Sequence, residues 1–329
     1  MRFEHFAGNA AAKRQLSADV DAGRFPHALL IEGPAGSGKR TLARLLAKAA
    51  VCTGEGEKPC GVCPGCVKAA GGGHPDILEA GGDGAARSFH IDTVRAVREG
   101  AYVLPNEAPR RAVLLFGAHN MTEQAQNALL KILEEPPSHL VFVLTCENRS
   151  QMLSTIQSRT VCLSLAGVPE DEALPLLRER RPEAEEEELR RALAVFGGVI
   201  GQVLQGMEDG VFRKVLDLAP ALALAVTAPD ELELLRLCAG LEKDKEALNG
   251  ALGGLSLLFR DALIQRCGGG RTLSTSPETA DKLARTLTRR QLMALLDTVE
   301  DLQRARLRNM NNTLFLTWMP ARLRAAAGR

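Results

Sequence analysis

Aromatic residues and net charge are both scarce in this sequence. Phe, Tyr and Trp make up 4% of the 329 residues, with one Trp and one Tyr. The formal net charge is +1, which excludes a chain that binds nucleic acid through an overall positive charge, so any DNA contact would need a local basic patch. Leu and Ala are abundant instead, and both favour helices.

Long apolar segments are also missing. No run of 18 apolar residues occurs, and the first 16 residues lack the apolar core of a signal peptide. We therefore expect no membrane-spanning helix and a cytoplasmic protein. At roughly 100–200 residues per domain, the length predicts two or three domains.

Strand and helix signals alternate in the first half of the chain. Short apolar runs, typical of buried strands, are separated by helical patterns between residues 27 and 165. This alternation predicts an α/β fold with a parallel sheet covered by helices on both faces. After Pro169 the strand signals stop and the pattern is helical. The predicted strands are residues 27–32, 76–80, 112–116, 140–145 and 160–165.

Short polar side chains mark the beginnings of two predicted helices. Asn9 begins a helical pattern over residues 9–23, and Thr122 precedes another that ends before Pro136. Both side chains are expected to cap the first turn of their helix. A glycine-rich loop is expected at residues 81–88.

Residues 33–40, GPAGSGKR, fit the phosphate-binding pattern G-x-x-x-x-G-K between a predicted strand and a predicted helix. Gly33, Gly36 and Gly38 allow tight turns that point backbone N–H groups at phosphate oxygens. Lys39 is expected to lie against the outer phosphates.

The usual magnesium ligand is missing from this loop. Arg40 occupies the position of the Ser or Thr whose hydroxyl holds Mg²⁺, and a guanidinium has no acceptor lone pair. Thr41 carries a hydroxyl, but it lies one position later, about 100° further around a helix. The loop is thus predicted either to bind ATP still, with Thr41 among its ligands, or to be vestigial, empty or occupied by an anion.

Acidic residues are missing from the neighbouring strand as well. P-loop ATPases place Asp, and often Glu, at the end of a nearby strand to hold Mg²⁺ and position water. Here Phe116 and Gly117 stand at that place. His119 follows and is able in principle to act as a base, although polar capping is the commoner role of such a residue. These two losses predict little or no ATP hydrolysis by the chain itself.

Half of the eight cysteines lie in one short cluster. The spacing Cys52-x7-Cys60-x2-Cys63-x2-Cys66 supplies four thiolates, which match a tetrahedral structural Zn²⁺ site with no open position for catalysis. An iron–sulfur cluster and free thiols are the alternatives. The metal would hold together a polar insertion at about residues 50–70.

The other cysteines are scattered along the chain. They lie in apolar stretches and are expected to be buried small hydrophobes. They are Cys146, Cys162, Cys238 and Cys267.

Several of these motifs together resemble the bacterial clamp-loader ATPase family of DNA polymerase III. The matching segments are residues 26–43, the cysteine cluster, GGHPDI at 72–77, MTEQAQNALLKILEEPP at 121–137 and LSTIQSR at 153–159. Residues 121–137 and the zinc spacing are the most specific.

The resemblance implies a layout in three parts. These are an AAA+ core at residues 1–166 that contains the zinc module, a small helical lid at 167–207, and an all-helical collar at 208–329 that forms oligomers. An apolar helical pattern at residues 307–323 would belong to the collar.

The family's Ser-Arg-Cys motif falls on Ser158, Arg159 and Thr160. The resemblance implies that Arg159 is an arginine finger, which reaches the ATP site of a neighbouring subunit. Without the resemblance, Arg159 would be interpreted as an ordinary surface or salt-bridged arginine. Thr160 in place of Cys leaves the arginine intact.

Within this family the pattern resembles the delta-prime branch, the non-hydrolysing stators. The resemblance implies a component of a DNA-directed DNA polymerase holoenzyme that is no enzyme by itself. It would help to load the sliding clamp on primed DNA with the gamma/tau and delta subunits as partners. A gamma/tau-like motor ATPase is the alternative, which Phe116 and Gly117 oppose. A zinc-dependent DNA-binding protein ranks last, because only Lys58 and Lys68 accompany the cysteines.

Overall fold

The computed structural model describes residues 1–81, 91–270, 272–274, 276–306 and 310–329. The chain divides into two compact units, Met1–Gly167 and Val168–Arg329. Most of the loop predicted at residues 81–88 and the first residues of the pattern predicted at 307–323 lie outside the described residues.

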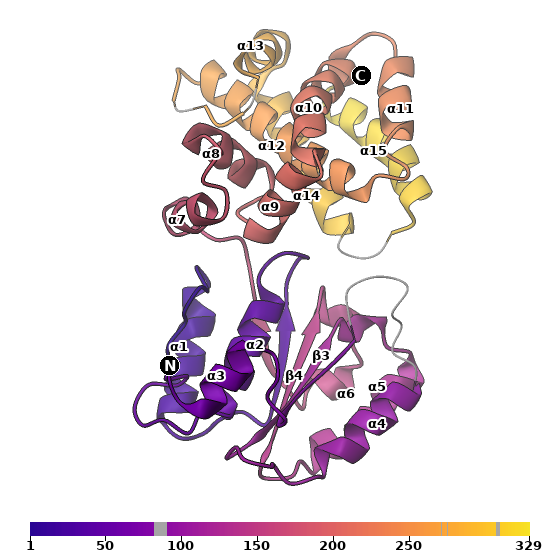
Figure 1. Ribbon diagram of the computed structural model, residues 1–329. Helices are drawn as coiled ribbons and strands as arrows, with labels where there is room; N and C mark the ends of the chain where they lie inside the picture. Colours follow the sequence, from indigo (N-terminus) through magenta and orange to yellow (C-terminus); the bar gives the residue numbers. More distant parts are fainter. Residues whose placement is uncertain (82–90, 271, 275, 307–309) are drawn as a thin grey trace. The chain divides into compact units, whose positions relative to one another are not determined.

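A five-stranded sheet forms the centre of the first unit (Figure 1). Its order is β2-β3-β4-β1-β5, and every neighbouring pair is parallel. The parallel α/β fold predicted from the alternating pattern is therefore confirmed. The strands are β1 (Ala28–Glu32), β2 (Ile77–Gly81), β3 (Arg111–Phe116), β4 (Leu140–Cys146) and β5 (Val161–Ser164), and the helices are α1 (Ala10–Asp21), α2 (Lys39–Ala50), α3 (Pro64–Ala70), α4 (Ile91–Ala101), α5 (Glu123–Glu134) and α6 (Ser154–Gln157).

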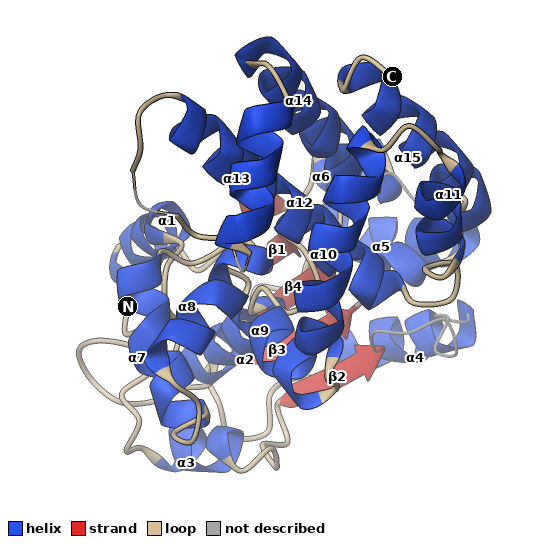
Figure 2. Cartoon of the chain, turned by 90° about the horizontal axis from the view of Figure 1, so that it is seen from above, coloured by secondary structure: helices blue, strands red, loops and turns tan. Residues whose placement is uncertain are grey.

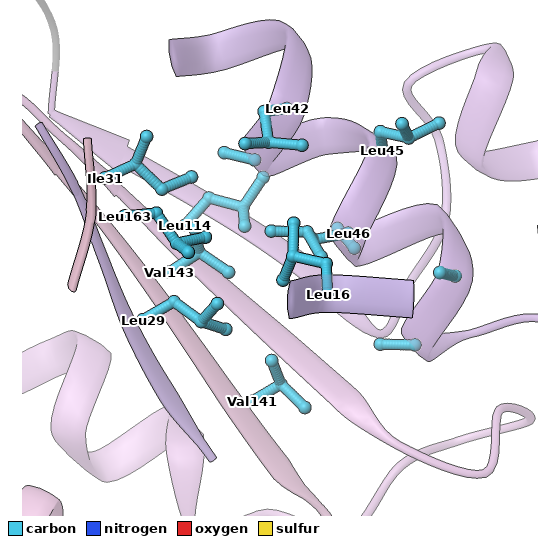
Figure 3. Close-up of a cluster of buried hydrophobic side chains, with 14 of the residues drawn as sticks. Leu16, Leu29, Ile31, Leu42, Leu45, Leu46, Leu114, Val141, Val143 and Leu163 are labelled. Carbon is cyan, nitrogen blue, oxygen red and sulfur yellow. The ribbon is translucent and has the colours of Figure 1, made fainter. Parts of the chain in front are cut away.

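Both faces of this sheet are apolar because helices cover both. On one face, side chains of α1 and α2 such as Leu16 and Leu46 pack on alternate residues of β1, β3, β4 and β5 (Figure 3). On the other face, α4, α5 and α6 pack on the intervening residues, with Leu129 and Ile156 among the buried side chains. Since successive side chains of a strand point to opposite faces, strands buried on both sides have continuous apolar sequences.

β1 lies inside the sheet, between β4 and β5. Its first four residues, Ala28–Ile31, are fully or almost fully buried. β5 is an edge strand, shorter than the predicted residues 160–165, and its Val161 and Cys162 are only half-buried. Because all the strands are parallel, the carboxyl ends of β1, β3 and β4 meet at the same edge of the sheet, which is where open α/β sheets bind ligands.

The two predicted helix caps have different outcomes. Thr122 caps α5 as expected, since its side chain accepts a hydrogen bond from Ala125 N. Asn9 precedes α1, but its side chain does not cap that helix. It has a left-handed backbone with φ 53°, and its Oδ1 accepts a hydrogen bond from Ala166 N, 2.9 Å away. Asn9 therefore ties the start of α1 to the residues after β5, a contact between distant parts of the chain.

In the described residues of the second unit, all regular secondary structure is helical (Figure 2). Its central element is α12 (Lys245–Arg266), which packs against α8, α10, α13 and α14. By length and composition α12 is also able to span a membrane. However, 61% of its most apolar 18-residue stretch is buried inside the structure, as in the core helix of a soluble protein. The remaining helices are α7 (Glu170–Arg180), α8 (Glu186–Val195), α9 (Ile200–Glu208), α10 (Val211–Thr227), α11 (Leu232–Ala239), α13 (Pro277–Thr286), α14 (Arg289–Arg306) and α15 (Asn312–Ala326).

Glycines on α12 let its neighbours come unusually close. A Cβ at Gly253 would lie 2.0 Å from the carbonyl oxygen of Val195, the last residue of α8. A Cβ at Gly254 would lie 2.6 Å from the Cβ of Ala219 on α10. Such distances are far below van der Waals contact, so these two positions require glycine.

We predict that Gly253→Ala destabilises the chain by about 1–3 kcal/mol, because overpacking outweighs the higher helix propensity of Ala. Gly100→Ala on α4 is the matched control, since the nearest atom to its new Cβ lies 3.6 Å away. That change should stabilise by about 0.4–1 kcal/mol. Urea unfolding of both variants measures the difference, and a Gly253→Ala variant as stable as Gly100→Ala would contradict this packing.

Candidate nucleotide and metal sites

The loop between β1 and α2 has the backbone of a phosphate-binding loop. Gly36 and Gly38 have φ values of 79° and 89°, a region that favours glycine. A Cβ at Gly33 would lie 2.7 Å from the carbonyl oxygen of Leu165, so that residue must also be glycine. The three glycines found in the sequence pattern are thus each required by the conformation of the loop.

Lys39 and Thr41 point to different environments at the start of α2. Lys39 is only 8% exposed, and its Nζ donates hydrogen bonds to the carbonyl oxygens of Gly33 at 2.7 Å and Pro34 at 2.8 Å. Its ammonium group therefore lies within the loop. Thr41 is exposed. Both residues remain predicted rather than observed ligands of a nucleotide.

Two arginines and an aromatic ring occupy the edge of the sheet where ATPases hold a metal ion. Phe116 ends β3, and the guanidinium carbons of Arg40 and Arg44 lie 5.0 Å and 5.5 Å from the centre of its ring. These are cation–π distances. Glu79 of β2 binds Arg44 through two hydrogen bonds of 2.9 Å and 2.8 Å, which raise the pKa of that guanidinium. Two guanidinium groups and one carboxylate thus lie beside the ring of Phe116.

Sequence reasoning missed two polar residues beside the loop. Thr145, near the end of β4, is fully buried, and its Oγ1 accepts a hydrogen bond from Gly117 N at 3.0 Å. Glu32, at the end of β1, accepts hydrogen bonds from Ser164 Oγ at 2.5 Å and from Arg149 N at 3.1 Å. Their position at the ends of predicted parallel strands was the available signal. His119 lies half-buried in the turn after β3.

Arg159 follows α6 and precedes β5. Its Nη2 lies 2.7 Å from Glu134 Oε1, at the end of α5. Its Nη1 donates hydrogen bonds to Thr155 O at 2.9 Å and to Ser158 Oγ at 3.3 Å. The side chain is 34% exposed, so a partner molecule is able to reach it.

The four clustered cysteines converge on one point. Cys52 follows α2, and Cys63 caps α3 through Cys66 N. All four ligand atoms lie within 4.8 Å of one another, with Sγ–Sγ distances of 4.0 Å for Cys60–Cys66 and 3.9 Å for Cys63–Cys52. Sulfurs about 2.3 Å from a central Zn²⁺ form a tetrahedron with edges of about 3.8 Å. The residues therefore fit a tetrahedral metal such as zinc.

Backbone N–H groups around the cluster favour negatively charged sulfur. Cys60 N lies 3.3 Å from Cys52 Sγ, and Cys63 N lies 3.3 Å from Cys60 Sγ. Burial by itself raises the pKa of the Cys63 thiol, but hydrogen bonds from Cys66 N–H and from Thr53 lower it to about 5. Burial raises the pKa of Cys66 to about 12. A cationic metal would supply the charge that keeps all four sulfurs deprotonated.

Exposed polar contacts are among those that fasten the cysteine segment to the rest of the unit. Lys68 of α3 lies 2.6 Å from Glu107 in the segment before β3. Arg2 donates a hydrogen bond through Nη1 to Cys60 O at 3.3 Å. Such exposed contacts are weak, and a metal bound by the four sulfurs would add an internal link.

The prediction that the remaining cysteines are buried is partly wrong. Cys146 and Cys238 are buried, and burial raises the pKa of each to about 12. Cys162 is half-buried, because β5 is an edge strand, and Cys267 is exposed at the end of α12. Burial decreases toward the end of α12, because Ala262 is buried, Leu263 and Ile264 are half-buried and Cys267 is exposed.

We predict that Cys60→Ser removes stoichiometric zinc from the purified chain, because three thiolates leave one corner of the tetrahedron without a sulfur ligand. Cys238→Ser, which changes a buried cysteine on α11, is the control and should retain the metal. Elemental analysis after dialysis against a chelator measures both. Equal zinc content in the two variants would contradict a four-sulfur site.

Comparison with known proteins finds relatives among the subunits of DNA polymerase III. The family described as "DNA polymerase III, delta subunit" matches residues 8–169. The chain is 39% identical over 161 residues to the DNA polymerase III subunit gamma/tau of Mycobacterium tuberculosis, an alignment that covers 48% of this chain but 27% of that protein. It thus spans about a quarter of the length of these gamma/tau relatives.

Another relative aligns over a larger part of both sequences. The DNA polymerase III subunit delta' of Escherichia coli is 31% identical over 287 residues, 87% of this chain and 84% of that protein. Among solved structures, a gamma-subunit-related protein of Thermotoga maritima is similar at 21% identity with a TM-score of 0.40, covering 95% of this chain and 99% of its own. The identity to delta' over most of both proteins shows that the chain is a member of the clamp-loader subunit family of DNA polymerase III.

Proposed function

We propose that this chain is a delta-prime-type stator of the clamp loader. In this role it helps to load the sliding clamp on primed DNA, and it completes the ATP site of a neighbouring subunit without hydrolysing ATP itself. The observation that carries the proposal is the replacement of the metal-binding groups by Arg40 and Phe116, while Arg159 is retained.

The extent of the similarity supports the delta-prime assignment. The delta' relative aligns with 87% of this chain, which includes much of the helical unit. The mycobacterial gamma/tau relatives are more similar at 39% identity, but their alignment covers 48% of this chain, and that of the Salmonella typhimurium tau subunit covers 66%. The alignment with delta' is the longer one, at 287 residues against 217, and this favours delta-prime.

The geometry at the carboxyl edge of the sheet supports the loss of hydrolysis. A P-loop ATPase needs Mg²⁺ between the outer phosphates, held by a hydroxyl and a strand-end carboxylate. In this chain the arginine beside Lys39 lies on the ring of Phe116, and the second arginine is bound by Glu79. Any nucleotide at Lys39 would be held by the glycine loop without a catalytic metal. The alternative, a motor ATPase, would need this metal.

Arg159 supports the action in trans. A guanidinium that is fixed at a partly exposed edge is able to place its charge on the γ-phosphate of another subunit. Such fingers raise the rate of phosphoryl transfer by roughly 10³–10⁵. The carbonyl and hydroxyl that hold Nη1 reduce the number of conformations that the side chain must lose on binding.

The remaining assignments follow from this role. The partners are the gamma/tau and delta subunits, with the sliding clamp and primed DNA bound through the complex. The location is cytoplasmic, with no membrane contact. Residues 167–207 form the lid and residues 208–329 the collar that joins neighbouring subunits, and the cysteine cluster holds a structural Zn²⁺.

The test is ATP turnover by the reconstituted clamp loader, with clamp and primed DNA, for the wild-type chain and for Arg159→Ala. ATP hydrolysis at the site completed by Arg159 should slow by roughly 10³-fold. Total turnover by the complex should therefore fall by at least the fraction that this site contributes. Arg24→Ala is the matched control, since Arg24 is an exposed arginine in the segment before β1 and lies outside the Ser158, Arg159 and Thr160 motif. Gel filtration verifies that each complex assembles.

If Arg159→Ala turns over ATP as fast as Arg24→Ala in an intact complex, the finger assignment is wrong. The chain would then be a purely architectural subunit. Magnesium-dependent turnover by the isolated chain, abolished by Lys39→Met, would instead support the motor alternative.

A further inference from the structure

Glu134 makes the ion pair that holds Arg159 on the surface of its own chain. The carboxylate belongs to the last residue of α5, and its Oε1 lies 2.7 Å from Nη2. The two residues are 25 positions apart in the sequence, so the pair depends on how α5 and α6 pack. The pair joins the end of the motif at residues 121–137 to the arginine of the motif at residues 153–159.

The guanidinium is largely committed to these contacts. An arginine has five N–H donors. Nη1 donates to Thr155 O and Ser158 Oγ, and Nη2 donates to Glu134. A phosphate is best gripped by two parallel N–H groups of one guanidinium edge. These contacts use three of the five N–H groups and occupy the edge formed by Nη1 and Nη2, so a phosphate that approaches this edge must displace at least one of the present acceptors.

We propose that Glu134 is a positioning residue that competes with the phosphate of a neighbouring subunit's nucleotide for Arg159. The inference rests on the proposed function of Arg159 as a finger. With Glu134 bound, Arg159 stays on its own chain. When the complex brings a neighbour's γ-phosphate close, the more highly charged anion replaces the carboxylate.

The exposure of the pair sets the size of the effect. The Arg159 and Glu134 side chains are 34% and 48% exposed, so water and salt screen their attraction. Exposed pairs of this kind change an equilibrium by about two- to fivefold. Glu134 would thus shift the equilibrium of Arg159 toward its own chain by a small factor. A correctly placed phosphate binds the guanidinium strongly enough to reverse this shift.

The experiment measures ATP turnover by the reconstituted complex without clamp and without DNA, where the neighbouring site is least well formed. Glu134→Gln should raise this turnover by about two- to fivefold, because the neutral amide competes less well for the guanidinium. The rise should shrink in concentrated salt, which already weakens the wild-type pair. A residue that only supported the fold would lower turnover when changed.

Two further variants make the result specific. Glu135→Gln removes the same charge one residue later, at the exposed end of α5, and should leave turnover unchanged. Glu134→Gln combined with Arg159→Ala should behave as Arg159→Ala alone, because the carboxylate acts only through the arginine.

The outcomes separate the two claims. Unchanged or reduced turnover in Glu134→Gln, while Arg159→Ala still slows the complex, overturns the competition and leaves the finger in place. No effect of Arg159→Ala overturns the proposed function itself. A rise in Glu135→Gln equal to that in Glu134→Gln would attribute the effect to general charge and would also overturn the inference.

Discussion

The parallel pairing of β1 with β4 on one side and β5 on the other is the constraint on which both candidate phosphate functions depend. It places the glycine loop after β1, the ring of Phe116 after β3 and the Arg159 segment before β5 around one sheet. The pairing itself is stabilised by apolar burial on both faces, where side chains such as Leu30 and Ile31 are completely buried. A disturbance of β1 would therefore affect the loop and the finger together.

The charges around the loop differ from those of a motor ATPase. Where a motor ATPase attracts a divalent cation with carboxylates, this chain has Arg40 and Arg44, whose partners are the ring of Phe116 and the carboxylate of Glu79. The same chain keeps a third arginine at an exposed edge. On the proposed account, the loop retains its shape because β1 and α2 need it for packing, while the chemistry is performed at a neighbour's site.

Local sequence predicted much of this structure. The glycine loop, the Thr122 cap, the five strands and the cysteine cluster depend on residues close together in the chain, so their patterns are visible without a structure. Asn9 was a different case, because its partner Ala166 lies 157 residues away. The pairing of Glu134 with Arg159 and of Glu79 with Arg44 escaped prediction for the same reason. Cys267 was misjudged because periodicity does not locate the end of a buried helix face.

The central claim is that this chain acts on a neighbour's nucleotide and not on its own. Lys39→Met in this chain alone tests it most directly, measured as clamp-dependent ATP turnover by an otherwise wild-type complex. The account predicts turnover close to that of the wild type, because no hydrolysis depends on this loop. A loss as large as that caused by the same change in a motor subunit would contradict it.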